Sequence, residues 1–68
     1  MTVIVNGEPA EVAAGSTVAE LLAHLGHPPS GAGVAVALNG EVVPRTAWPA
    51  TGLGERDRVE VLGATQGG

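Results

Sequence analysis

The sequence has no cysteine, no lysine and only one aromatic residue, Trp48. The lack of cysteine excludes a disulfide framework, a thiolate metal site and a thiol nucleophile. The lack of lysine means that no side-chain amine could capture an activated carboxyl group on the same chain. Val, Ala and Leu supply most of the hydrophobic fraction of 44%, which is typical of a folded aliphatic core and not of a disordered chain.

Positive charge is also scarce. Seven acidic residues against three arginines give a net charge of -4, which opposes phosphate backbones and leaves no basic surface for nucleic acid. No hydrophobic run approaches the length of a membrane span, and residues 1–4 lack the basic start of a secretory signal. We therefore expect a cytoplasmic protein with neither a nucleic-acid partner nor a membrane partner.

The length of 68 residues leaves room for one small domain with a thin core and little space for a catalytic cleft. Residues 59–63 are the last strand-like segment, and the residues that follow end in two glycines. We expect a domain at residues 1–63 and a flexible tail at residues 64–68.

The first part of the chain predicts a hairpin followed by a helix. Residues 2–6 have the alternation of a strand, with Val3 and Val5 on one face. Asn6-Gly7 supplies the positive φ of a tight turn into a strand that reaches Val12. Thr17 and Glu20 form a capping box that starts a helix. The helix has one apolar stripe, made of Val18, Leu21, Leu22 and Leu25.

The second part predicts another hairpin and a final strand. In residues 34–38, larger aliphatic residues alternate with alanine, as in a strand with one buried face. Asn39-Gly40 offers a second tight turn, and Pro44 ends the strand at residues 41–43. The final strand covers residues 59–63.

The order of hairpin, helix, hairpin and strand predicts an α+β fold in which a mixed sheet of four to five strands wraps one helix. Residues 49–55 have no strong period, so we expect an irregular crossover there. Leu53 and Trp48 are expected to cover the core.

Candidate catalytic and metal-binding groups are few. His24 and His27 lack a third ligand in register, and histidine near a helix C-terminus also complements the macrodipole. The spacing of the serine and threonine residues does not suggest a catalytic arrangement with a histidine and an acid, and the acidic residues are scattered. We expect no catalytic residue, no metal site and no bound cofactor.

Two aliphatic residues are expected on the sheet face turned away from the helix. Strand alternation places Ile4 opposite Val3 and Val5, and Leu62 opposite its own strand neighbours. If the first and last strands are neighbours, Ile4 and Leu62 would form a small apolar patch for docking a partner.

The chain ends in Gly67-Gly68, reached through Ala64-Thr65-Gln66. Two successive glycines leave a thin tail that can enter a narrow enzyme channel. We expect Gln66, Gly67 and Gly68 to enter partner active sites, with the Gly68 carboxylate as the distinctive chemical group.

Several stretches form a family pattern, namely residues 34–45 (VAVALNGEVVPR), Trp48, Leu53, residues 57–61 (DRVEV) and Gly67-Gly68. Together with residues 1–7 and 17–22, they resemble the ThiS family of bacterial thiamine-pathway sulfur carriers over nearly the whole chain. The resemblance implies a ubiquitin-like β-grasp fold. The chain departs from the family at Arg56, where the family commonly carries glycine, and in an elongated segment at residues 28–33.

The resemblance implies that Gly68 is the site of covalent chemistry. An ATP-using, E1-like adenylyltransferase of the ThiF type would join AMP to Gly68, because a free carboxylate is a poor electrophile. A persulfide-bearing sulfur donor would then leave a thiocarboxylate there, and thiazole synthase of the ThiG type would receive the sulfur for the thiazole of thiamine. The chain would be a carrier and not an enzyme.

Three other roles remain open. The small subunit of molybdopterin synthase uses the same terminal thiocarboxylate, although it is usually longer and more aromatic. A ubiquitin-like protein modifier would join Gly68 to lysines of other proteins. An unrelated binding module would keep its activity after the loss of Gly67 and Gly68.

Overall fold

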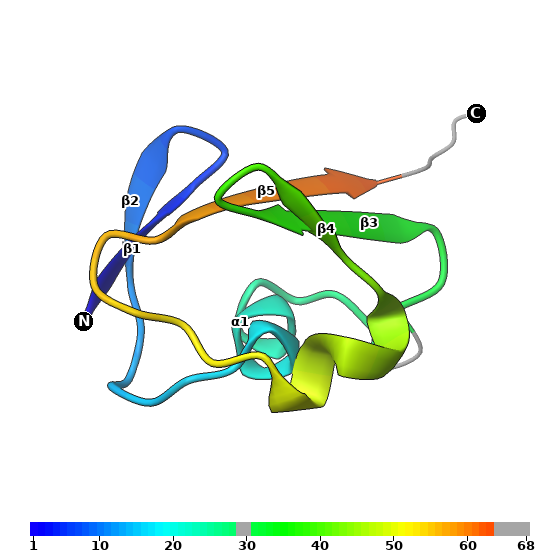
Figure 1. The fold of residues 1–68 in the computed structure, drawn as a ribbon, viewed down its shortest axis with the longest axis horizontal. Helices are drawn as coiled ribbons and strands as arrows, with labels where there is room; N and C mark the ends of the chain where they lie inside the picture. Colours follow the sequence, from blue (N-terminus) through cyan, green and yellow to red (C-terminus); the bar gives the residue numbers. More distant parts are fainter. Residues whose placement is uncertain (29–30, 64–68) are drawn as a thin grey trace.

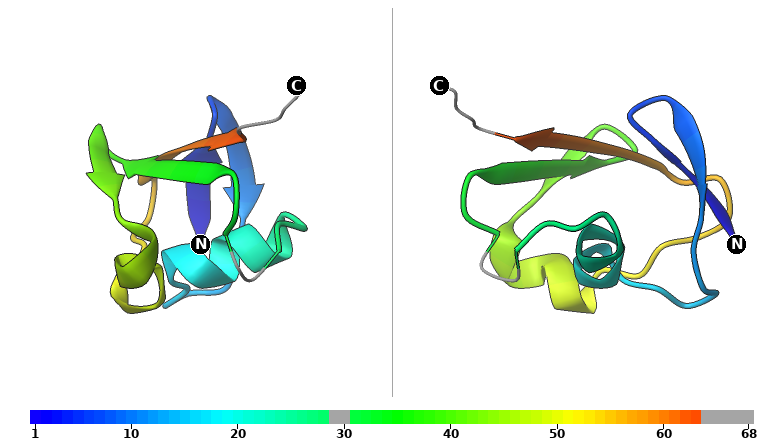
Figure 2. Two further views of the ribbon diagram at one scale, coloured as in Figure 1. Left: turned by 90° about the vertical axis from the view of Figure 1, so that its right-hand side faces the viewer. Right: turned by 180° about the vertical axis from the view of Figure 1, so that it is seen from behind.

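The computed structural model describes residues 1–28 and 31–63 and has two layers. Figure 2 shows the sheet on one side and the helical segments on the other. The elements, labelled in Figure 1, are β1 (Thr2–Val5), β2 (Glu8–Glu11), α1 (Val18–His24), β3 (Val34–Leu38), β4 (Glu41–Val43), a 3-10 helix η1 (Arg45–Ala50) and β5 (Arg58–Gly63).

The strands form one mixed sheet in the order β2-β1-β5-β3-β4. Strands β1 and β2 are antiparallel, as are β3 and β4, and the two hairpins are joined through β5. Strand β5 is parallel to β1 and antiparallel to β3. This five-stranded sheet over one α-helix is the ubiquitin-like β-grasp fold, which confirms the predicted architecture.

Both predicted hairpin turns are present. Asn6 and Asn39 have φ of 51° and 49°, and the glycine that follows each of them has a larger positive φ. Such left-handed backbone is accessible to asparagine and most readily to glycine. Arg56 also has a positive φ of 66°, a backbone conformation that glycine adopts most readily, so the glycine common at this position in the family that the sequence resembles has a physical reason.

The α-helix begins as its capping box predicts. The Glu20 N–H donates to Thr17 Oγ1 at 3.2 Å, and the Thr17 N–H donates to Glu20 Oε1 at 2.9 Å. Leu21 is fully buried, whereas Leu25 is the C-cap and is 39% exposed, so the buried stripe is shorter than predicted.

Within the described part of the chain, no helix is long and apolar enough to span a bilayer.

The core lies between the sheet and the helical layer. Its buried hydrophobic residues are Val3, Val18, Leu21, Leu22, Val36, Trp48, Leu53, Val59 and Val61. These residues come from β1, α1, β3, β5 and the connection between β4 and β5, so one core joins the three central strands to the helical layer.

The connection from β4 to β5 is more regular than predicted. Pro44, with φ of -61°, ends the strand as expected and is also the N-cap of η1, which was not predicted. The Trp48 Nε1–H donates to the Val43 carbonyl at 2.9 Å, so the indole is buried with its polar atom satisfied. Trp48 and Leu53 cover the core, as the sequence predicted.

Gly31 gives a test of the packing beside η1. A Cβ atom there would lie 2.6 Å from both Trp48 Cζ3 and Arg45 Cδ, and its φ is +68°. We expect Gly31→Ala to lower the free energy of unfolding by about 2 kcal/mol, because the added methyl group overpacks the site and alanine is strained in left-handed backbone. Thermal melting followed by Trp48 fluorescence measures the loss.

Gly52→Ala is the matched control, because a Cβ at position 52 meets nothing within 4 Å and no positive φ is required. Equal melting temperatures for the two variants would contradict the proposed close packing of Gly31 against Trp48.

Candidate functional site

Strand β5 leads the chain from the middle of the sheet to its last described residue, Gly63. Figure 1 shows that this strand ends at the side of the molecule opposite Met1. The predicted tail residues Gln66, Gly67 and Gly68 lie outside the described residues, so their entry into partner active sites stays a prediction. The described part of the site is therefore the surface around the end of β5.

The sheet face turned away from α1 carries exposed aliphatic residues beside the end of β5. Leu62 and Val42 are 68% and 78% exposed. Leu62 lies opposite Ala35 on β3, and Val42 lies opposite Ala37 on the same strand. These alanines alternate with inward-facing Val36, so both lie on the outer face. We name Ala35, Ala37, Val42 and Leu62 the outer patch.

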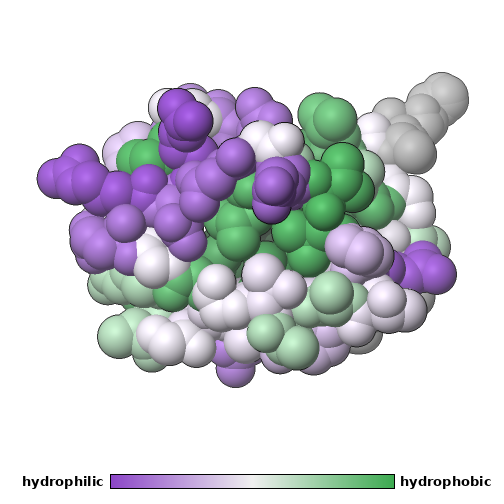
Figure 3. Space-filling view, in the orientation of Figure 1, coloured by the Kyte–Doolittle hydropathy of each residue, from purple (hydrophilic) through white to green (hydrophobic). Residues whose placement is uncertain are grey.

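The polarity of the surface changes along the sheet. Figure 3 shows hydrophobic side chains gathered over the part of the molecule that contains β3, β4 and β5. Hydrophilic side chains cover the part that contains β1 and β2. The exposed residues Val42 and Leu62 of the outer patch belong to strands of this apolar part, and exposed apolar surface is typical of a docking surface.

Ile4 lies apart from the outer patch. Strands β1 and β5 are neighbours, as the docking hypothesis required, and Ile4 is half-buried opposite Arg58. Leu62 is four residues farther along β5, which is roughly 13 Å at the usual rise per residue, with Glu60 between. Ile4 and Leu62 therefore do not adjoin, and docking at either residue stays a prediction.

A hollow of about 350 Å³ lies at the end of β5, beside the outer patch. Leu62, Gly63 and Ala35 line it together with Arg45, which is the only charged residue among the described residues that line it. Among the described residues, the ion pair at 3.6 Å between the Met1 amine and Glu11 is the only one. The Arg45 guanidinium therefore has no carboxylate partner in this part of the chain and could bind an acidic group of a docked protein.

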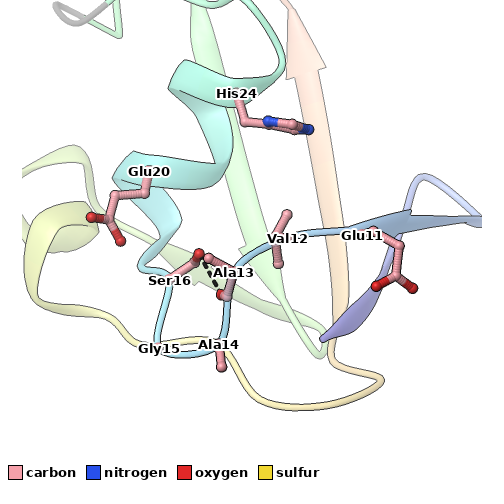
Figure 4. Close-up of a pocket in the computed structure, with 8 residues that line it drawn as sticks. All are labelled: Glu11, Val12, Ala13, Ala14, Gly15, Ser16, Glu20 and His24. Carbon is pink, nitrogen blue, oxygen red and sulfur yellow. Dashed lines mark hydrogen bonds between the residues drawn. The ribbon is translucent and has the colours of Figure 1, made fainter.

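A larger hollow, of about 520 Å³, lies near the start of α1 and contains Ser16, Glu20 and His24 (Figure 4). The Ser16 hydroxyl donates to the Ala13 carbonyl at 2.6 Å, and the Glu20 carboxylate is used by the helix cap. Figure 4 shows that the His24 ring and the Ser16 hydroxyl do not point toward each other. These residues form a turn and a helix cap, not a nucleophile with its base.

Glu11, on the rim of the same hollow, has a lowered pKa with a local structural cause. The Thr2 hydroxyl donates to its carboxylate, and the nearby Met1 ammonium also favours the charged form. The side chain is 76% exposed and pairs across the β1–β2 edge of the sheet. This shift reflects the pairing of two strands and does not indicate a catalytic acid.

The two histidines belong to no group of metal ligands among the described residues. His24 is exposed in the last turn of α1, and His27 is half-buried just beyond it. Within residues 1–28 and 31–63, no group of three or more His, Cys, Asp or Glu side chains could hold a metal ion.

Sequence reasoning missed two residues of this surface, Val42 and Arg45. Val42 could have been found, because a two-residue Asn39-Gly40 turn fixes the register that places it opposite Ala37. Arg45 had no such local signal. Its position follows from η1 and from the packing of its side chain beside Gly31.

Comparisons with known proteins agree on one family. The sequence profile of the ThiS family matches residues 3–68. A crystal structure of the thiamine biosynthesis protein ThiS from Geobacter metallireducens is 41% identical, with 100% of both chains covered and a TM-score of 0.82. An NMR solution structure of a thiamine biosynthesis protein from the same organism is also 41% identical, with a TM-score of 0.83 and coverage of 100% of this chain and 88% of that one. No curated protein matches the sequence. The chain belongs to the ThiS family.

Proposed function

We propose that this chain is a sulfur carrier protein of thiamine biosynthesis and that it carries sulfur as a thiocarboxylate on Gly68. The main support is membership of the ThiS family, with a match that extends through Gly67-Gly68. The printed names of the two similar structures add support, because both name thiamine biosynthesis.

The chemistry requires activation before sulfur transfer. A carboxylate is a poor electrophile because its charge is delocalised and oxide is a poor leaving group. An E1-like adenylyltransferase of the ThiF type would join the Gly68 carboxylate to the α-phosphorus of ATP and release pyrophosphate. The sulfur of a persulfide donor would then displace AMP, and cleavage of the resulting S–S bond by a thiol would leave the thiocarboxylate.

The sulfur would finally pass to thiazole synthase of the ThiG type, which forms the thiazole of thiamine. In this proposal the partner enzymes contribute every catalytic group, and ATP is the co-substrate of the activating enzyme. The described residues are consistent with that division, because the Ser16 hydroxyl and the Glu20 carboxylate are both used in local hydrogen bonds.

The surface around β5 supports a role in presenting the tail. The outer patch and the hollow beside Arg45 lie at the end of the strand that leads to the diglycine. A partner that contacts Leu62 and Arg45 would hold the domain close to the point from which the tail begins. We propose that both partner enzymes dock on the outer face of the sheet, where Leu62, Val42 and Ile4 lie.

A mass measurement tests the carrier function. The chain is incubated with ATP, a ThiF-type enzyme and a persulfide donor, and the tryptic fragment of residues 59–68 is weighed. This fragment is chosen because oxidation of Met1 would imitate an oxygen-to-sulfur exchange in the intact protein. We expect a sulfur-for-oxygen exchange at Gly68 that is absent without ATP.

A variant that lacks Gly67 and Gly68 is the control and should keep its melting temperature while it loses all sulfur loading. An unchanged fragment, in the presence of enzymes that load another carrier in parallel, would contradict the proposal. Isopeptide adducts between Gly68 and lysines of other proteins would instead favour the modifier role.

Leu62→Asp and Val42→Asp test docking on the outer patch. Both side chains are more than two-thirds exposed, so the substitutions should change the melting temperature little. A charge placed in an apolar interface costs about 1.4 kcal/mol or more, and about 1.4 kcal/mol is tenfold in affinity, so we expect KM for the carrier in the loading reaction to rise at least on the order of 10-fold.

Ile4→Asp measures how far the docking surface extends toward β1, and Ala14→Asp is the charge-matched control. Ala14 is exposed on the loop before α1, in the helical layer and away from the outer face. KM values for the Leu62 and Val42 variants equal to that of Ala14→Asp would remove the outer patch from the docking surface.

A further inference from the structure

The side chain of Asn6 replaces a missing piece of the β1–β5 ladder. In this parallel ladder, the Ile4 N–H donates to the Asp57 carbonyl at 2.8 Å and the Asn6 N–H donates to the Val59 carbonyl at 2.9 Å. The regular continuation would have the Asn6 carbonyl accept from the Val61 N–H. Strand β1 ends before that point, because Asn6 has φ of 51° and turns the chain toward β2.

The Asn6 carboxamide takes over both bonds that the ladder loses there. Its Oδ1 accepts from the Val61 N–H at 2.8 Å, and its Nδ2 donates to the Val61 carbonyl at 3.1 Å. The first bond replaces the one that the Asn6 carbonyl would have made. The second replaces a bond from the residue two positions farther along a continued β1. A carboxamide can do this because it carries a donor and an acceptor, as a peptide group does.

The position of Val61 makes this contact relevant to the end of the chain. Val61 is a core residue with 8% exposure, and the next residue, Leu62, is the exposed aliphatic residue of the outer patch. Beyond Asn6, the last residues of β5 pair only with β3 among the described strands, through Ala35 opposite Leu62 and Val34 opposite Gly63. The carboxamide therefore supplies the hydrogen bonds on the other edge of β5, one residue before Leu62.

We propose that Asn6 is a positioning residue for sulfur loading, whose carboxamide fixes Val61 and thereby sets the position of Leu62 and the direction in which the chain leaves β5. This role rests on the proposed carrier function. When a partner docks on Leu62 and holds the tail extended in its channel, the start of the tail sets how far Gly68 reaches, and a reacting group displaced by about 1 Å can lose on the order of 100-fold in rate.

Asn39 provides a comparison within the same chain. It has nearly the same backbone conformation, with φ of 49°, and its side chain also bonds to β5. Its Oδ1 accepts from the Arg58 N–H at 2.9 Å, and its Nδ2 donates to Asp57 Oδ1 at 3.1 Å. These contacts hold the beginning of β5, whereas those of Asn6 hold its end.

The experiment compares Asn6→Gly with Asn39→Gly in the full chain. Glycine accepts the left-handed backbone at both turns, so each variant loses a carboxamide without forcing the turn to change. We expect similar decreases in melting temperature. Hydrogen exchange of the Val61 and Leu62 amides, measured by NMR, should accelerate about 10-fold or more in Asn6→Gly only.

Sulfur loading by the ThiF-type enzyme supplies the second readout. We expect Asn6→Gly to lower kcat on the order of 10-fold while KM changes much less, and Asn39→Gly to leave both near the original values. Asn6→Asp keeps an acceptor for the Val61 N–H but loses the donor to its carbonyl, and we expect it to change kcat in the same direction.

The outcomes separate this proposal from the carrier function. Unchanged exchange at Val61 in Asn6→Gly would overturn the contact itself, and faster exchange with unchanged kcat would overturn the positioning role. Equal effects of the two glycine variants on kcat would show a general loss of stability and would also overturn that role. An original chain that cannot be loaded would overturn the carrier function, whereas the exchange rates would still decide whether Asn6 holds Val61.

Discussion

The pairing of β5 with two different neighbours is the constraint on which the rest of the structure depends. This strand is parallel to β1 and antiparallel to β3, so it joins two hairpins that otherwise share no hydrogen-bonded edge. Its inward residues Val59 and Val61 belong to the core under the sheet, and Leu62 lies on the opposite face. One strand thus closes the core, contributes Leu62 to the outer patch and leads to the chain end that the proposed chemistry uses.

The sequence predicted those parts of the fold that are determined by neighbouring residues. The Asn-Gly turns need only left-handed backbone at two positions, and the helix cap joins Thr17 to Glu20, which are one turn apart. The alternation of residues 34–38 likewise predicted which side of β3 is buried. Because these signals are local, they gave the element order and, with the family resemblance, the fold.

The features that sequence reasoning missed depend on partners that are distant along the chain. The separation of Ile4 from Leu62 follows from the register between the first and last strands, which alternation alone does not give. The helix η1 is accompanied by burial of Trp48 in a core whose other residues come mostly from distant strands, such as Val3 of β1 and Val59 of β5. The bonds of Asn6 span 55 residues, so its Asn-Gly pattern predicted the turn but not what its side chain would bind.

The Asn6 carboxamide has a consequence for aggregation. Unpaired N–H and carbonyl groups along the edge of a strand can template the addition of a strand from another copy, and short or covered edges suppress this pairing. Strand β1 stops before β5 does, which would open the β5 edge from Val61 onward. The carboxamide covers both backbone groups of Val61, so a turn side chain shortens the edge at which two copies could join.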